Sequence, residues 1–474
     1  MRHPICPTLI PLRRVRPFQL RHVSRPYTTE SGTRNGFSWT RKSSEPALSC
    51  LPLTNVIRTY LITSISSSPT LWRLTFALLK RMANSSSFLA DPDKNLPLRW
   101  ILKKTFYAQF CAGENKEEAR LTAQLIRDIG YHGVIIESAL EVTGDLGVTT
   151  APATETTEKE IETWRNNMLA TVRMVQDGEF VALKWSGLGQ FALMLLNANR
   201  PPSEAMKAAI HEVCDVAAAK DVAILPGAEE EATNAGIDTW TLDLMRKYNS
   251  GHSGRTIMYN TYQAYLKSTP ARLARHLAAA KLEGYTLGIK LVRGAYLESE
   301  SKSLLLPSKE DTDRVYNALA KSLLQGEYDE ILQPVYGSDS DAFPSIALVL
   351  ATHNMESVQR AQKIRNDQAA LGLHRIEFAY AQLQGMADEV GCEIIQMGRS
   401  AKTTQNEGEQ GPLWRKTDVP RAFKCLPWGS TSECLQYLMR RASENRDAAT
   451  RTEGTRRAMG SELIRRAKRA VLIA

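Results

Sequence analysis

The sequence lacks the features that stabilise a secreted protein or anchor a membrane-spanning one. Its seven cysteines are scattered over 474 residues, are odd in number and form no Cys-x-x-Cys pair. This pattern indicates reduced thiols and argues against a disulfide framework or a zinc site. In the apolar region 51–83 the longest uncharged stretch covers residues 59–72, and these 14 residues are rich in serine. That stretch is too short and too polar to span a bilayer.

The central part of the chain also lacks an excess of positive charge. The whole sequence carries a formal charge of +9, but residues 1–45 contribute +7 and residues 451–474 contribute +5. By difference, residues 46–450 carry −3. A protein that binds nucleic acid usually has a basic stripe on its folded body, so we expect no nucleic acid partner.

Acidic residues are absent from the first 29 positions, which instead hold six arginines among serines and threonines. This composition is typical of a mitochondrial transit peptide, although a disordered basic tail would share it. We predict a transit peptide and linker over residues 1–45, cleavage near Tyr27 and a location in the mitochondrion.

Eight short apolar segments recur along the rest of the chain, each followed by a segment with helical periodicity. The predicted strands cover residues 133–136, 180–185, 222–225, 256–259, 287–292, 345–351, 376–379 and 421–426. This rhythm is typical of a (β/α)8 barrel and also of a doubly wound open sheet. Polar residues directly after nearly every strand favour the barrel, as does the absence of Gly-x-Gly-x-x-Gly after the first strand.

The predicted fold class is therefore α/β, with a (β/α)8 TIM-type barrel over residues 117–450. We expect an N-terminal helical arm over residues 46–116 and a basic C-terminal helix over residues 451–474. Within the arm, residues 72–82 have the periodicity of an amphipathic helix, with basic side chains on its polar side. Such a helix either packs on the body of the protein or lies on a membrane surface.

The residues at the predicted strand ends are mostly cations and amides. They are Lys184, Glu229, Gln263, Lys290, Arg293, Thr352, His353, Gln382 and, in the last helix, Arg440 and Arg441. A mouth of this composition favours an anionic ligand, such as a phosphate-bearing cofactor, a carboxylate substrate, or both. His353 alone is more typical of a hydrogen-bonded structural histidine, and no ligand spacing indicates a metal site. Gly294 allows the backbone to approach a bulky planar ligand.

Six segments together resemble the proline dehydrogenase (proline oxidase) family. They are residues 106–114 (FYAQFCAGE), 259–267 (YNTYQAYLK), 290–300 (KLVRGAYLESE), 351–354 (ATHN), 382–386 (QLQGM) and 437–445 (YLMRRASEN). The order and spacing of these motifs make the resemblance specific, and the chain is similar to mitochondrial fungal-type members. The resemblance implies a distorted barrel that binds FAD non-covalently, oxidises L-proline to Δ1-pyrroline-5-carboxylate and passes electrons to ubiquinone. It also implies association with the matrix side of the mitochondrial inner membrane.

The resemblance further implies roles for individual residues. The FAD contacts would be Gln263, Lys290, Arg293, Gly294, Ala295, Thr352, His353 and Gln382, with Lys290 near the N5/O4 edge of the flavin. The substrate carboxylate would be held by Lys184, Arg440 and Arg441, and the pocket would be lined by Tyr296 and Cys425. Three cations on one carboxylate would orient a small molecule for hydride transfer, and a cation near the flavin would stabilise its reduced form.

Two positions depart from the family pattern. The family usually has Asp-Ala-Glu after the third strand, where this chain has Gly227-Ala228-Glu229, and it has a tyrosine where this chain has Cys425. These changes are compatible with neutral drift, with a changed substrate, or with impaired catalysis in a flavin- or ligand-binding paralogue. A residue smaller than tyrosine leaves room for an added hydroxyl, so hydroxyproline or another cyclic imino acid is an alternative to L-proline.

Overall fold

The computed structural model describes residues 46–83, 87, 90–140, 154–251, 255–335, 343–406, 417–444 and 448–473. The transit peptide and linker predicted over residues 1–45 lie outside the described residues.

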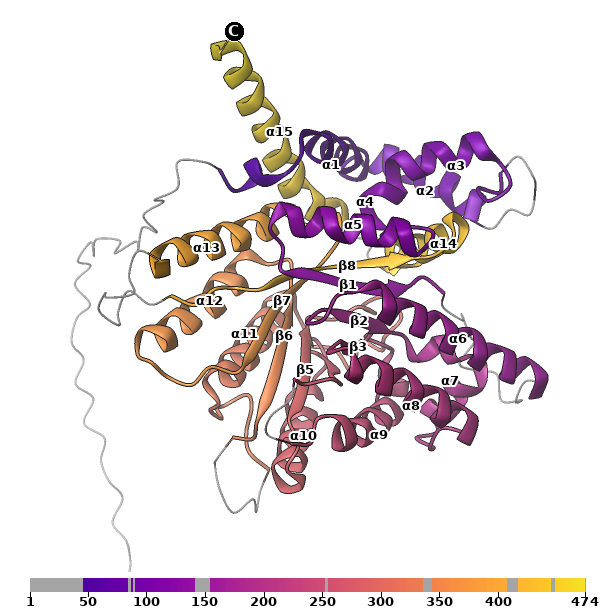
Figure 1. Cartoon of the computed structure of the whole chain (residues 1–474), viewed down its shortest axis with the longest axis vertical. Coiled ribbons are helices and arrows are strands. Elements are labelled where there is room, and N and C mark those ends of the chain that lie inside the picture. The colour runs from indigo at the N-terminus through magenta and orange to yellow at the C-terminus, as the bar shows by residue number, and fades with distance from the viewer. Residues whose placement is uncertain are drawn as a thin grey trace, which may run out of the picture. The chain divides into compact units, whose positions relative to one another are not determined.

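Eight parallel strands form a nearly closed barrel (Figure 1). The strands are β1 (Gly133–Ser138), β2 (Phe180–Leu183), β3 (Ala223–Pro226), β4 (Asn260–Gln263), β5 (Leu287–Val292), β6 (Ile346–Ala351), β7 (Glu377–Leu383) and β8 (Ala422–Trp428). The last strand pairs with the first, with Cys425 opposite Ile135. Strands β3 and β4 meet only at a bridge between Ile224 and Met258. The prediction of a distorted barrel rather than an open sheet is therefore confirmed.

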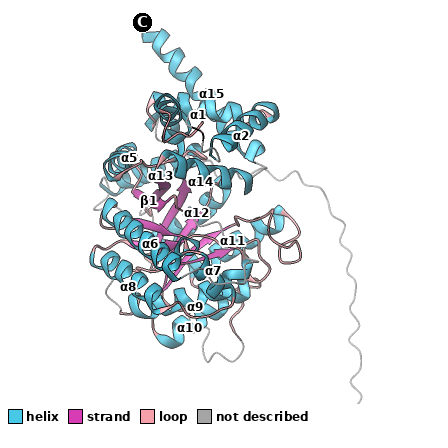
Figure 2. Cartoon of the chain, turned by 90° about the vertical axis from the view of Figure 1, so that its right-hand side faces the viewer, coloured by secondary structure: helices cyan, strands magenta, loops and turns pink. Residues whose placement is uncertain are grey.

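Helices surround the strands on the outside (Figure 2). They are α5 (Lys116–Ile129), α6 (Thr154–Met174), α7 (Gln190–Asn197), α8 (Glu204–Ala219), α9 (Glu231–Tyr248), α10 (Thr269–Glu283), α11 (Lys309–Gln325), α12 (Met355–Ala370), α13 (Asp388–Asn406) and α14 (Thr431–Glu444). Capping side chains determine where several of these helices begin. The Asn115 side chain accepts a hydrogen bond from the Glu118 N–H at the start of α5, and Asn354 does the same for Ser357 at the start of α12.

The barrel interior is filled by side chains at alternate positions of the strands. Buried interior residues include Ile135 on β1, Leu225 on β3, Val349 on β6 and Phe423 on β8. Several other interior positions are alanines, namely Ala182, Ala223, Ala347, Ala379 and Ala381. Because alanine fills little space, the layer above them has room for longer side chains at the carboxyl ends of the strands.

The fourth strand is displaced from its predicted position. We expected residues 256–259, but β4 covers Asn260–Gln263, and Met258 makes only a bridge. Three of the four residues of β4 are polar, and all are buried. They are tolerated because they are hydrogen-bonded: Asn260 donates to Asp238 at 2.7 Å, and the Thr261 hydroxyl donates to the Pro226 carbonyl at 2.6 Å. Hydrophobicity therefore favours residues 256–259, the segment ahead of the strand, over β4 itself.

Helices from both ends of the chain lie together beside the barrel, above α5 and α14 in Figures 1 and 2. They are α1 (Leu53–Ser66), α2 (Pro69–Ala83), α3 (Leu96–Leu102), α4 (Ala108–Phe110) and α15 (Ala448–Ile473). The Tyr60 ring of α1 lies close to Gly460 of α15, and α2 packs on α14. No helix among the described residues combines the length and the apolar character needed to cross a bilayer.

Candidate active site

Strand alternation brings five polar or small side-chain positions together at one end of the barrel. Interior side chains alternate along each strand, so the positions that follow Ile135, Ala182, Leu225 and Phe423 by two residues also face inward. These positions are Glu137, Lys184, Gly227 and Cys425, and Lys290 on β5 joins them. All five lie at the carboxyl end of the barrel, where enzymes of this architecture bind their substrates.

Lys290 reaches across the mouth from β5 to the end of β3. Its ammonium group donates to the Pro226 carbonyl at 2.6 Å. Desolvation by the surrounding protein lowers the pKa of Lys290 to about 8, while the nearby Cys425 and Glu137 act in the opposite direction. Burial, and next the charge of Glu137, raises the pKa of the Cys425 thiol to about 12. Cys425 is therefore a neutral thiol at physiological pH.

Lys184 occupies the space that Gly227 leaves open. The Lys184 ammonium group lies 3.2 Å from the Ala228 carbonyl and 3.5 Å from the Tyr296 hydroxyl. A Cβ atom at position 227 would be 2.8 Å from the aliphatic carbons of Lys184 and 3.1 Å from its nitrogen. The departure from the family pattern at Gly227 therefore changes where this lysine can rest.

Arg441 is held between two aromatic rings at the mouth. Its guanidinium carbon lies 5.9 Å from the centre of the Tyr296 ring and 5.6 Å from that of Tyr437. The Tyr437 hydroxyl in turn donates to the buried carboxylate of Glu137 at 2.9 Å. Arg440 precedes Arg441 on α14 and therefore points about 100° away from it. The structure thus places Arg441 beside Tyr296, with Arg440 half-buried on another side of the helix.

A second group of predicted residues lies on β4 to β7. The Gln263 side chain accepts from the Ala295 N–H at 3.1 Å and donates to the Glu229 carbonyl at 2.9 Å. Arg293 donates to Asp313 at 2.6 Å. It also donates to the hydroxyls of Thr352 and Ser357, each at 2.9 Å. This guanidinium group is fixed on three sides by the protein.

Thr352, His353 and Gln382 belong to the same group. The Gln382 amide donates to the Thr352 carbonyl at 3.3 Å, and His353 Nε2 accepts from the Leu383 N–H at 3.4 Å. His353 is therefore hydrogen-bonded to the backbone at the end of β7. The Oε1 atom of Gln382 is buried and has no hydrogen-bond partner among the described residues. An N–H donor of a ligand would satisfy it.

The structure gives a more direct reason for glycine at position 294 than the one inferred from the sequence. We expected the missing side chain to admit a planar ligand. The structure shows that a Cβ atom there would overlap the ring of Tyr265, and that the backbone φ is +156°. The residue is therefore glycine because of its neighbour and its backbone conformation.

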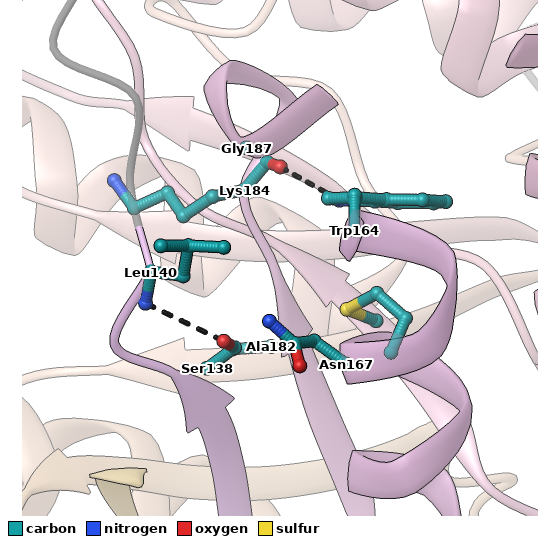
Figure 3. A pocket seen from close by; sticks show the side chains of 8 residues that line it. Ser138, Leu140, Trp164, Asn167, Ala182, Lys184 and Gly187 are labelled. Carbon is teal, nitrogen blue, oxygen red and sulfur yellow. Dashed lines mark hydrogen bonds between the residues drawn. The ribbon is translucent and has the colours of Figure 1, made fainter. Parts of the chain in front are cut away.

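A small cavity lies beside the mouth, between the ends of β1 and β2 and helix α6 (Figure 3). It is lined by Ser138, Leu140, Trp164 and Lys184 among others. The Trp164 indole donates to the backbone carbonyl of Lys184 at 3.2 Å, and the lysine side chain extends away from this ring. The tryptophan thus fixes the backbone from which Lys184 projects.

Sequence reasoning missed two contributors to the mouth, Glu137 and Tyr437. Glu137 follows the first predicted strand directly and could have been found by the rule that identified Lys184. Tyr437 lies four residues before Arg441 on α14, so both project from the same side of the helix. Glu229 was noted at a strand end, and its carboxylate accepts from the Tyr296 hydroxyl at 3.3 Å. Among the described residues, no group of His, Cys, Asp or Glu side chains is arranged to hold a metal ion.

The fold and these contacts define a class of protein, a (β/α)8 barrel whose mouth gathers cations at the carboxyl ends of its strands. A family model described as proline dehydrogenase matches residues 139–454, which is more than half of the chain. The chain therefore belongs to the proline dehydrogenase family and is an oxidoreductase of that family. The family resemblance that the motifs indicated is confirmed.

Individual relatives agree with this assignment. The chain is 28% identical over 415 residues to hydroxyproline dehydrogenase of Mus musculus, covering 77% of this chain and 82% of that protein. It is 26% identical over 393 residues to proline dehydrogenase 1, mitochondrial, of Caenorhabditis elegans, covering 80% of this chain and 57% of that protein.

Among solved structures, the chain is similar to proline utilization A from Bdellovibrio bacteriovorus inactivated by N-propargylglycine. The TM-score is 0.57 at 17% identity, and the match covers 80% of this chain and 37% of that one. At this level of identity the likeness shows the fold alone.

Proposed function

We propose that this protein oxidises a cyclic imino acid with FAD, L-proline to Δ1-pyrroline-5-carboxylate being the reference reaction. The observation that carries the proposal is the convergence of Lys184, Arg441 and Tyr296 at the barrel mouth next to Lys290. Two cations beside an aromatic ring suit a small molecule that has a carboxylate at one end and an apolar ring at the other.

The residues on β4 to β7 fit FAD by their chemistry. Arg293 supplies a fixed guanidinium group suited to a phosphate or a ribose, and Gln382 supplies a buried amide oxygen without a partner among the described residues. The other proposed FAD contacts are Gln263, Gly294, Ala295, Thr352 and His353. Lys290 lies between this group and the substrate group, consistent with a place near the reactive edge of a flavin.

The chain's own side chains would bind and orient the substrate. Lys184 and Arg441 hold the carboxylate, assisted by Arg440, and Tyr296 packs against the ring. FAD, when bound, supplies the acceptor for the hydride. The positive charge of Lys290 favours electron density arriving beside it. The substrate amine loses its proton first, so the rate rises with pH until the free amine dominates.

A second substrate is favoured by Cys425. This thiol lies among Lys290, Lys184 and Glu137, and it is smaller than the tyrosine that the family usually has at this position. An added hydroxyl on the substrate ring would find room there. The likeness to hydroxyproline dehydrogenases also supports hydroxyproline as a substrate. The third alternative is a paralogue with impaired catalysis. Flavin reduction by L-proline or by hydroxyproline distinguishes an active enzyme from such a paralogue.

We further propose that the protein acts in the mitochondrion and passes electrons to ubiquinone at the inner membrane. The support is the arginine-rich start of the chain and the mitochondrial relatives it resembles.

The deciding experiment is anaerobic titration of the purified protein with L-proline and, separately, with trans-4-hydroxy-L-proline. The protein is expected to be yellow, and at least one of the two compounds should bleach the flavin absorbance. A ratio of kcat/KM values then assigns the preference. A yellow protein that neither compound reduces would contradict the enzymatic proposal and favour the impaired paralogue.

A further inference from the structure

Two cysteines from distant parts of the sequence are in contact on the outside of the barrel. Cys50 is the last residue of the short helix η1 (Ala47–Cys50), and Cys392 lies near the start of α13. Helix η1 packs on α13 and on α15 (Figure 1). The Cys392 thiol donates a hydrogen bond to the sulfur of Cys50, and neither cysteine is in a disulfide. We call Cys50 and Cys392 the thiol pair.

The backbone around Cys50 is fixed on both sides of the residue. The Arg466 guanidinium group of α15 donates to the Leu48 carbonyl at 3.1 Å and to the Leu51 carbonyl at 2.8 Å. Arg466 is itself paired with the buried carboxylate of Glu462 at 2.7 Å. The position of Cys50 therefore does not depend on the contact between the two sulfur atoms.

The two thiols differ in how readily they ionise. The hydrogen bond from Cys392 lowers the pKa of Cys50, and the charge of Arg399 lowers it further, although burial acts in the opposite direction. The same hydrogen bond, together with burial, raises the pKa of the Cys392 thiol well above its usual value. The proton therefore stays on Cys392, and the nucleophilic thiolate forms at Cys50.

The two thiols also differ in their exposure to solvent. Cys392 is fully buried, whereas Cys50 is partly exposed. Of the six cysteines in the part of the chain that the structure describes, Cys425 is the other partly exposed one, and burial raises its pKa to about 12. Among these six, Cys50 alone combines partial exposure with a lowered pKa.

We propose that the thiol pair is a site of oxidation by peroxide, at which a disulfide forms between the N-terminal arm and the barrel. The Cys50 thiolate attacks hydrogen peroxide, so that an S–O bond forms, the O–O bond breaks, and the leaving hydroxide takes up a proton to become water. The Cys392 sulfur then attacks the sulfenic acid on Cys50. The S–S bond forms, the S–O bond breaks, and the hydroxide leaves as water with the proton of Cys392. In total, two thiols and one hydrogen peroxide give one disulfide and two waters.

The cross-link requires little movement and should stabilise the protein. Sulfur atoms in hydrogen-bond contact reach a bond length of about 2 Å through small side-chain rotations. The two residues belong to segments far apart in the sequence, so a bond between them restricts the unfolded chain. The proposal depends on neither the substrate nor the electron acceptor, and it therefore goes beyond the proposed function.

A second thiol contact provides an internal comparison. Cys111 and Cys434 are also hydrogen-bonded to each other, but they are only 3% and 0% exposed. Burial raises the pKa of the Cys111 thiol well above its usual value. If proximity alone decided reactivity, this pair would oxidise as readily as the thiol pair. Under the proposal, it stays reduced.

The test is treatment of the full-length, flavin-loaded, reduced protein with hydrogen peroxide, followed by thiol blocking and mass spectrometry of tryptic peptides. We expect a link between peptides 43–58 and 376–399, which dithiothreitol reverses. This link should form about 10-fold or more faster than any link between Cys111 and Cys434, because the thiolate is the reactive species. The linked protein should have a Tm about 5 °C higher than the reduced protein. Equal oxidation of both pairs, a link from Cys50 to Cys6, or an unchanged Tm in the linked protein would contradict the proposal.

Two serine variants identify the thiol that peroxide attacks. In Cys392→Ser the serine hydroxyl can still donate to Cys50, so oxidation should stop at a sulfenic acid on Cys50 that dimedone labels. In Cys50→Ser, dimedone should not label Cys392. The matched control is Cys214→Ser, in which a buried cysteine of α8 is replaced and the link should form as in the wild type. Label on Cys392, or none on Cys50, would overturn the assignment.

Alkylation of the unsubstituted protein tests the same assignment without a variant. Iodoacetamide should modify Cys50 before the other five cysteines of the described ranges, and slower modification of Cys50 than of Cys425 would contradict the proposal. These measurements do not use imino acid oxidation, so failure of the proposed function would leave their results unchanged.

Discussion

The two sides of the barrel mouth hold their cations in different ways. On β5 and β6, Arg293 is fixed by the carboxylate of Asp313 and by two hydroxyls. On the side formed by β1, β2, β3 and β8, Lys184 and Arg441 lie against carbonyl, phenol and aromatic groups. On the first side, which we call the cradle side, the cation is fixed by hydrogen bonds to the protein. On the second side, both cations lie beside Tyr296, and a carboxylate ligand would complement their charge.

The two departures from the family pattern fall on the second side alone. Gly227 contacts Lys184, and Cys425 lies beside Glu137 and Lys290. Under the proposed function, these two departures would leave cofactor binding unchanged and would alter substrate choice. Variants on the two sides of the mouth should therefore change different quantities.

Arg441→Ala should lower kcat/KM for the imino acid by about 100- to 1000-fold, because losing one partner of a desolvated charge pair costs about 3–4 kcal/mol. Flavin content should stay near the wild-type value. Steady-state kinetics and the absorbance ratio of flavin to protein measure both quantities. A variant purified without flavin would show that the two sides are not separate.

Arg293→Ala should give the opposite result. Loss of a charge-assisted contact is expected to weaken FAD binding by about 10- to 100-fold. Saturating FAD should restore much of the activity, with KM for the imino acid little changed. Fluorescence titration of the apoprotein measures the affinity. A raised KM with full flavin content would place Arg293 on the substrate side instead.

Cys425→Tyr should shift the preference between the two imino acids. Filling the pocket wall is expected to lower kcat/KM for hydroxyproline relative to proline by about 10-fold, since one small group in a pocket changes specificity by that order. Cys425→Ser is the matched control and should keep the wild-type ratio. An unchanged ratio in the tyrosine variant would mean that residue 425 does not contact the substrate ring.

Lys290 should give the pH profile a falling limb near its pKa of about 8. Activity that needs the ammonium charge is lost as pH rises through this value. Lys290→Arg should move the falling limb upward by more than one pH unit, because arginine stays charged. Profiles of kcat/KM measure the limb. An unmoved limb would assign it to another group.

Global stability should respond to pH in the opposite sense at this residue. The pKa of Lys290 is lower in the folded protein than the usual 10.5. The unfolded chain therefore binds the extra proton, and this residue's contribution to stability increases as pH rises from about 8. Loss of activity without a fall in Tm over this range separates titration from unfolding.

Gly227→Ala should have the smallest effect, a loss of a few-fold in kcat/KM. The new Cβ would approach the flexible aliphatic part of Lys184, which can shift. Gly227→Asp combined with Cys425→Tyr should raise proline oxidation if these two positions limit it. If the double variant is no more active than the wild type, these positions do not account for any impairment.

Most of the fold was predictable because its signals are local. Strands are visible as apolar runs and helices as periodic segments, and the predicted strand over residues 287–292 matches β5. Strand β4 was not predictable from hydrophobicity, since Asn260, Thr261 and Gln263 are buried by hydrogen bonding to distant partners. Those partners become neighbours only when the barrel closes.

The sequence predicts which residues form the candidate site better than it predicts which of them contact each other. The positions of Lys184 and Lys290 near strand ends mark them as candidates, and Glu137 satisfies the same rule. Which of Arg440 and Arg441 lies between the two rings depends on the rotation of α14, which the sequence does not specify. Position 294 must be glycine partly because its backbone lies against the ring of Tyr265, which is 29 positions away in the sequence.

The pairing of β8 with β1 has a consequence for biosynthesis. Strands β4 to β7 are consecutive, so the cradle side is encoded in an uninterrupted part of the chain. The substrate side joins β1, β2 and β3 to a strand that leaves the ribosome some 290 residues after β1. Until residues 422–441 have emerged, β1 has an unpaired edge and Lys184 lacks its arginine companions. A nascent chain would therefore be exposed to aggregation along β1 for most of its synthesis, and a chaperone that protects this edge would act before the site exists.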